Sequence, residues 1–170
     1  MNWDAIGAVG EVLGALVVIG SLIYLSRQIR QNTDLGRAAA QREVNTAFNT
    51  VVYNLNSDPE IFRKALLDFE GLTKTEQFIA HNSLAPFANH LDQVIRMSQL
   101  GLESADSVKV FGDICIAVVT TPGGRIWWDQ INHLIPTEAA AYIERRLGDP
   151  PETLPPPMTE SLSWFRPDEA

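Results

Sequence analysis

The chain has 170 residues, a formal net charge of −8 at pH 7 and one cysteine. This acidic balance argues against a nucleic-acid partner, because nucleic acids bind proteins that concentrate basic residues on one face. A single cysteine excludes an internal disulfide, and the apolar neighbours of Cys115 predict a buried thiol in a reducing compartment.

Residues 5–25 form an almost wholly apolar segment that contains one carboxylate, Glu11. A helix rises about 1.5 Å per residue, so this segment would extend roughly 31 Å. That length matches a hydrocarbon core of about 30 Å. Trp3 and Tyr24 lie near its two ends, where interfacial aromatic rings are common. The sequence therefore predicts a transmembrane helix over residues 1–26, in contact with membrane lipid.

The basic residues near this segment follow it and do not precede it, which predicts a cytoplasmic C-terminal side and an N-terminus outside. A cleaved signal peptide is the rival interpretation, but it needs a basic start and a small-residue cleavage site. The residues before the apolar segment include Asp4 and no Lys or Arg, and no obvious cleavage site follows the segment. Arg27 and Arg30 are expected to anchor the helix at the lipid interface. With Arg37 and Arg42 they form a basic collar that suits anionic lipid.

Small residues recur on one side of the predicted span. Helices in lipid associate by close packing, so such a face lets two backbones approach. We expect a helix–helix contact there, with a second copy of the chain or with another membrane-protein subunit, through Gly7, Gly10, Gly14 and Ser21.

Glu11 lies about 40° from Gly7 on the helical wheel. An ionised carboxylate at this depth is costly, so it should face protein or water or be protonated. One interpretation is a site that handles ions or protons in an oligomer. The other is a side chain that extends to the outer interface or takes part in a hydrogen bond between helices.

Helical periodicity continues beyond the span into a juxtamembrane stalk, which should end near residues 54–56. The polar cluster at 32–36 is a possible interruption. The rest of the chain lacks strand-like alternation, so the predicted fold is all-α. The expected parts are a transmembrane helix at 1–26, a stalk at 27–56, a small cytoplasmic helical bundle at 57–147 and a Pro-rich acidic tail at 148–170.

Helix starts in the bundle are predicted from capping signals. Two pairs have capping-box spacing, namely Ser57 with Glu60 and Thr73 with Glu76. Three further residues are expected to open helices, namely Ser104, Thr121 and Thr137. Gly101 should close the long helix that contains Pro86.

Trp127 and Trp128 begin an apolar set at helical spacing, which predicts core positions for them together with Ile131, Leu134 and Ile135. In the tail, five prolines between 150 and 157 favour an extended stretch without a helix. Three apolar residues near the end could dock on the bundle, touch the membrane or contact a partner: Leu162, Trp164 and Phe165.

The sequence offers little catalytic equipment, and it predicts no enzyme, no cofactor and no metal site. The histidines, His81, His90 and His133, lack a second ligand at a spacing that would place both on one helical face. The glycines at 123–124 with Arg125 could hold an anion at a helix start, although capping explains them equally well.

Four segments carry a recognisable pattern: residues 3–11, 21–25, 28–33, and the Pro-Gly-x-Arg-x-Trp-Trp segment at 122–128. These segments resemble a widespread group of small bacterial single-span membrane proteins with a Gly-rich N-terminal helix. The resemblance covers roughly residues 1–147 and omits the tail. It implies a bacterial inner-membrane protein of this architecture, in which Glu11 is part of a recurrent pattern, and it transfers no activity.

The expected function is that of a membrane-anchored helical scaffold or an accessory subunit of a membrane protein complex. Such a protein acts through helix–helix and bundle contacts rather than through catalysis. The alternative is a small oligomeric ion or proton channel, or a transporter component, that uses Glu11. An enzyme is the third possibility, and it would need a pocket assembled from residues such as His81, His90, Asp92 and Arg96.

Overall fold

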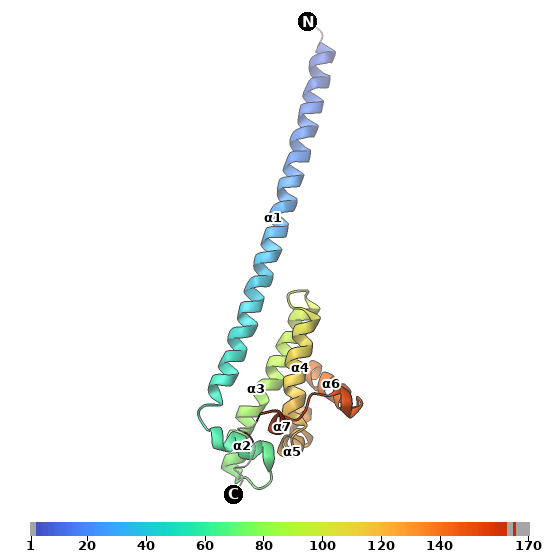
Figure 1. The fold of residues 1–170 in the computed structure, drawn as a ribbon. Coiled ribbons are helices and arrows are strands. Elements are labelled where there is room, and N and C mark those ends of the chain that lie inside the picture. The colour runs from blue at the N-terminus through green and yellow to red at the C-terminus, as the bar shows by residue number, and fades with distance from the viewer. Residues whose placement is uncertain (1–2, 163–164, 166–170) are drawn as a thin grey trace. The chain divides into compact units, whose positions relative to one another are not determined.

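The computed structural model describes residues 3–162 and residue 165, excluding the side chains of residues 3–6, 8 and 12. It confirms the all-α class, because the described residues form helices and no strand. Figure 1 shows the helices in chain order, and their bounds are α1 Trp3–Asn54, α2 Pro59–Leu67, α3 Lys74–Gln99, α4 Ala105–Val119, α5 Pro122–Ile131, α6 Thr137–Leu147 and α7 Met158–Ser161. Two short 3-10 turns, Asn132–Leu134 and Pro151–Thr153, complete the set.

The 52-residue helix α1 passes through residues 32–36 without interruption and ends within the predicted range. The Thr33 hydroxyl donates to the Ile29 carbonyl oxygen at 2.9 Å, so this polar side chain is satisfied inside the helix. Gly36 costs only about 1 kcal/mol relative to alanine, which a long helix tolerates. The chain forms two compact units, Met1–Ala39 and Ala40–Ala170, so the predicted stalk is divided between them.

In the second unit, α3 and α4 lie side by side, and α2, α5 and α6 pack around them. Their buried faces form one hydrophobic core. Its largest fully buried side chains include Trp127, Trp128, Leu66, Leu84, Leu91, Ile116 and Ile143.

Most of the capping predictions are confirmed. The Thr73 backbone N–H donates to Glu76 Oε2 at 2.8 Å, and Glu76 N donates to Thr73 Oγ1 at 3.3 Å, which is a capping box. Ser104 and Thr121 cap α4 and α5 through their hydroxyls. Gly101 follows α3 with a positive φ of 70°, a conformation that side chains disfavour.

The capping box predicted for Ser57 with Glu60 is wrong. Asp58 is the N-cap residue of α2, and it makes no side-chain capping hydrogen bond. Glu60 pairs instead with Arg63, with Nη2 and Oε2 3.2 Å apart, because an i, i+3 partner is available on the same helical face. Thr137 is likewise the first residue of α6 rather than its cap, since Pro136 occupies the N-cap.

The tail contains short helical turns as well as extended segments, so the prediction of a wholly extended stretch is wrong. Proline is compatible with the first turn of a helix, where its missing N–H costs no hydrogen bond, and Pro151 begins one such turn. The tail also contacts the bundle, because Leu154, Met158 and Phe165 pack against the core. The rings of Phe165 and Phe62 lie 5.9 Å apart, whereas Trp164 lies outside the described residues.

Candidate functional site

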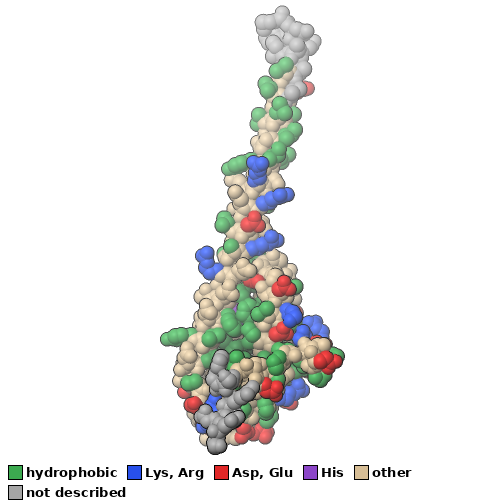
Figure 2. Space-filling model, viewed as in Figure 1, with side chains coloured by type: hydrophobic (Ala, Val, Ile, Leu, Met, Phe, Trp, Pro, Cys, Tyr) green, Lys and Arg blue, Asp and Glu red, His purple; other side chains and the backbone are tan. Residues whose placement is uncertain are grey.

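The first unit presents an exposed apolar surface along α1. Figure 2 shows hydrophobic side chains there, with Lys and Arg side chains further along the helix. Within the part of the chain that the structure describes, α1 is the one helix long and apolar enough to cross a membrane, by length and composition. Between residues 9 and 25, ten of its large apolar side chains are at least half exposed: Val9, Leu13, Leu16, Val17, Val18, Ile19, Leu22, Ile23, Tyr24 and Leu25.

The predicted contact face on α1 is open. A Cβ added to Gly7, Gly10 or Gly14 would meet nothing within 4 Å, so each position has room for a second helix. The Ser21 hydroxyl donates to the Val17 carbonyl oxygen at 2.8 Å, which satisfies it within its own helix. Glu11 is exposed beside this face. The helix–helix contact itself stays a prediction.

The predicted interface anchors occupy exposed positions where the structure describes them. Gln28 Nε2 donates to the Tyr24 hydroxyl at 2.9 Å, which joins the ring to the polar stretch that follows it. Arg27 and Arg30 are exposed on the same stretch. The side chain of Trp3 lies outside the described set.

The Pro-Gly-x-Arg-x-Trp-Trp segment begins α5 and brings it close to α2. A Cβ on Gly123 would lie 1.9 Å from the carbonyl oxygen of Ala65, so only glycine permits this approach. Gly124 N donates to Thr121 Oγ1 at 3.1 Å, and Arg125 pairs with Asp129 at 3.3 Å. These groups are therefore engaged in local structure, which favours the capping interpretation over an anion site.

Trp127 and Trp128 occupy the core, as predicted. Trp127 Nε1 donates to His81 Nδ1 at 3.3 Å, and Trp128 Nε1 donates to Glu144 Oε1 at 2.6 Å. Both polar edges of these buried rings are thus satisfied. The core position predicted for Leu134 is wrong, because the chain leaves α5 through a 3-10 turn and this side chain is 68% exposed.

The four residues considered for an enzyme pocket have separate surroundings. His81 accepts the hydrogen bond from Trp127. His90 is buried against the rings of Phe48 and Phe111, and burial lowers its pKa. Asp92 Oδ2 accepts from Arg96 Nε at 2.6 Å, and this hydrogen bond raises the pKa of Arg96. The arrangement resembles packing and ion pairing more than a catalytic constellation.

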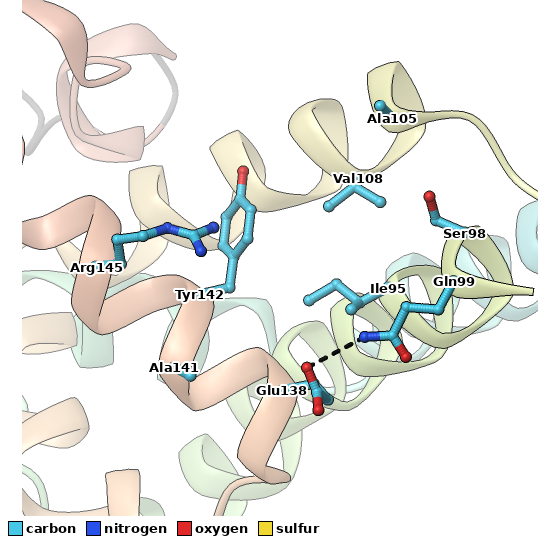
Figure 3. Close-up of a pocket in the computed structure, with 9 residues that line it drawn as sticks. All are labelled: Ile95, Ser98, Gln99, Ala105, Val108, Glu138, Ala141, Tyr142 and Arg145. Atoms are coloured by element: carbon cyan, nitrogen blue, oxygen red, sulfur yellow. Dashed lines mark hydrogen bonds between the residues drawn. The ribbon is translucent and has the colours of Figure 1, made fainter.

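A groove of about 350 Å³ lies between the end of α3, the start of α4 and one face of α6 (Figure 3). Sequence reasoning missed it, because its walls come from three helices separated by loops. Gln99 Nε2 donates to Glu138 Oε2 at 3.3 Å across it. Its lining mixes apolar and polar side chains: Ile95, Ser98, Gln99, Ala105, Val108, Glu138, Ala141, Tyr142 and Arg145.

The polar groups of this groove are largely paired with one another. The Arg145 guanidinium lies 5.2 Å from the centroid of the Tyr142 ring, which is a cation–π contact. Burial raises the pKa of Tyr142, so its phenol stays protonated at neutral pH. The groove therefore offers a surface for contact rather than an activated nucleophile or base.

Among the described residues, no cluster of three or more His, Cys, Asp or Glu side chains is placed to hold a metal ion. Burial raises the pKa of Cys115 to about 12, so this thiol is protonated at neutral pH. Its Sγ donates to the Phe87 carbonyl oxygen at 3.3 Å.

The sequence and the structure were compared with protein families, curated proteins and solved structures, and none of them matches the chain.

Proposed function

We propose that this protein is a membrane-anchored helical scaffold or an accessory subunit of a membrane protein complex. One observation carries the proposal. A continuous helix presents a bare apolar surface in the unit Met1–Ala39, while the unit Ala40–Ala170 has a well-packed core of its own. Exposed apolar side chains in this number are costly in water, and lipid or another protein lowers that cost.

The proposed location is the bacterial inner membrane, with the N-terminus outside and the bundle in the cytoplasm. The position of the arginines after the apolar segment supports this orientation. A cysteine at an exposed position of the bundle, such as Ser57, tests it in intact cells. The proposal expects protection from a membrane-impermeant thiol reagent until the cells are permeabilised, and labelling of intact cells would contradict the orientation.

Assembly is proposed to use the open face of small residues on α1. The test is the native mass of the tagged protein after gentle extraction from its own host's membrane. Multiples of one 18.8 kDa chain would indicate a homo-oligomeric scaffold, and foreign subunits at a fixed ratio would indicate an accessory subunit. A monomer without partners would contradict both.

A matched pair of variants locates the contact. Gly14→Ile adds bulk to the proposed face and should reduce the assembled fraction. Gly20→Ile adds the same bulk away from that face, about 120° from Gly14 and about 80° from Gly10 at roughly 100° per residue, and should reduce the assembled fraction less. Equal losses from both variants would show that the face of small residues is not the contact.

The second candidate function is a small oligomeric channel or transporter component, and the exposed carboxylate of Glu11 within an apolar surface supports it. In this case Glu11→Gln should change ion or proton flux through liposomes that contain the purified assembly. Unchanged flux, or no flux in either protein, would leave the scaffold or accessory role as the proposal.

A further inference from the structure

A histidine lies at the place where the last part of α1, residues 40–54, contacts the bundle. The Phe48 ring centroid is 5.4 Å from that of His90 and 5.1 Å from that of Phe111. The His90 and Phe111 rings are themselves 4.6 Å apart, edge to face. His90 is 4% exposed, and neither of its ring nitrogens has a hydrogen-bond partner among the described residues.

The 40–54 segment is held to the bundle mainly by apolar side chains. Ala40 and Val44 are buried, and Phe48 is half-buried against the core. The hydroxyls of Thr46 and Thr50 donate to the carbonyl oxygens of Arg42 and Thr46, so they bond within α1 and not to the bundle. A contact of this kind is sensitive to the appearance of a buried charge.

We propose that His90 makes the docking of the 40–54 segment depend on pH, because the docked segment encloses the neutral imidazole between aromatic rings. Protonation of His90 would bury a positive charge at a place where no carboxylate accepts a hydrogen bond from the ring. Freeing the segment exposes the ring to water, which solvates the imidazolium. The inference holds whether or not α1 enters a membrane, so it is independent of the proposed function.

The charged groups on the three elements involved do not compensate a proton on His90. On α1, Arg42 and Glu43 are exposed. On α4, Lys109 pairs with Asp113 at 2.7 Å. On α3, Asp92 Oδ2 accepts from Arg96 Nε at 2.6 Å, and the buried Asp92 Oδ1 has no hydrogen-bond partner among the described residues, so neither oxygen accepts from His90. Burial is accordingly the cause that lowers the pKa of His90.

The sign and the range of the effect follow from this lowered pKa. Well above pH 6.5, the ordinary pKa of histidine, the imidazole is neutral in both states and docking does not depend on pH. Below pH 6.5, His90 binds a proton more readily when the segment is free than when the segment is docked. The docking equilibrium constant then falls by at most about tenfold per pH unit, until the pH reaches the lowered pKa.

Hydrogen exchange of the full chain in mild detergent, at pH 7.5 and 5.5 and corrected for intrinsic rates, tests the proposal. We expect the protection factors of the amides of residues 48–54 to fall by up to about tenfold from pH 7.5 to pH 5.5, while those of residues 115–128 in the core stay the same. His90→Phe should remove this response, and His133→Gln, at an exposed histidine, should retain it. Equal responses in wild type and His90→Phe would overturn the proposal.

Two further results would also overturn it. One is loss of protection in the core together with the 48–54 segment, which would indicate global unfolding instead of local release. The other is an ordinary pKa near 6.5 for His90 in a direct NMR titration of the wild-type imidazole, because the docked ring would then not resist protonation. If His90→Phe does not fold, His90→Leu takes its place in the comparison.

Discussion

Substitution of Gly123 by alanine should destabilise the bundle, because this position allows α5 to approach the backbone of α2. The added Cβ would lie 1.9 Å from the Ala65 carbonyl oxygen and 2.9 Å from Phe69 N. Both obstacles are backbone atoms, so rotation of a side chain cannot relieve the clash. The helices would have to move apart by roughly 1.5 Å to reach an ordinary contact distance of 3.4 Å.

The magnitude follows from two opposing effects. Overpacking of a close-packed core costs about 1–3 kcal/mol, and a backbone obstacle places Gly123→Ala at the upper end of that range. Replacement of a helical glycine by alanine returns up to about 1 kcal/mol through helix propensity. We therefore expect a net loss of about 2 kcal/mol in the free energy of unfolding. For a unit of this size the melting temperature should fall by about 8 °C.

Thermal unfolding of the full chain in mild detergent, followed by near-UV circular dichroism, measures this loss through the buried Trp127 and Trp128. Gly148→Ala is the matched control, since the nearest atom to its added Cβ lies at 3.3 Å and its φ of −83° suits alanine. Its melting temperature should stay within about 2 °C of wild type. A Gly123→Ala protein that melts with the control would refute the close-approach argument.

Three other changes test separate parts of the bundle. Thr73→Ala removes the N-cap of α3 and should cost about 1 kcal/mol in chemical denaturation, whereas Thr73→Ser should cost much less. Cys115 should resist a thiol reagent at pH 8 until denaturant is added, because its thiol is buried and protonated. The free energy of unfolding should also fall as the pH rises from 9 toward about 12, because only the thiol of the unfolded chain ionises in that range. Trp128→Phe should lower the melting temperature more than Glu144→Gln, which keeps an acceptor for the indole; the reverse order would contradict the geometry.

Several features could be predicted from the sequence because neighbouring residues determine them. A capping box needs two side chains three residues apart, so Thr73 with Glu76 identifies the start of α3. The length of the apolar segment in α1 follows from its run of residues. Trp127 and Trp128 begin an apolar set that continues three and four residues later at Ile131, and both tryptophan side chains are buried as that spacing predicts.

Only the tertiary structure decided which distant residues meet. Spacing along the chain does not encode that Gly123 contacts Ala65, that His90 is enclosed by rings from α1 and α4, or that Phe165 returns to Phe62. The same reason explains the error at Leu134, whose exposure depends on where a turn directs the chain. Helix caps and the hydrogen bonds within a helix are local, whereas the packing of helix faces depends on every element at once, and that packing makes a buried histidine a pH-sensitive contact.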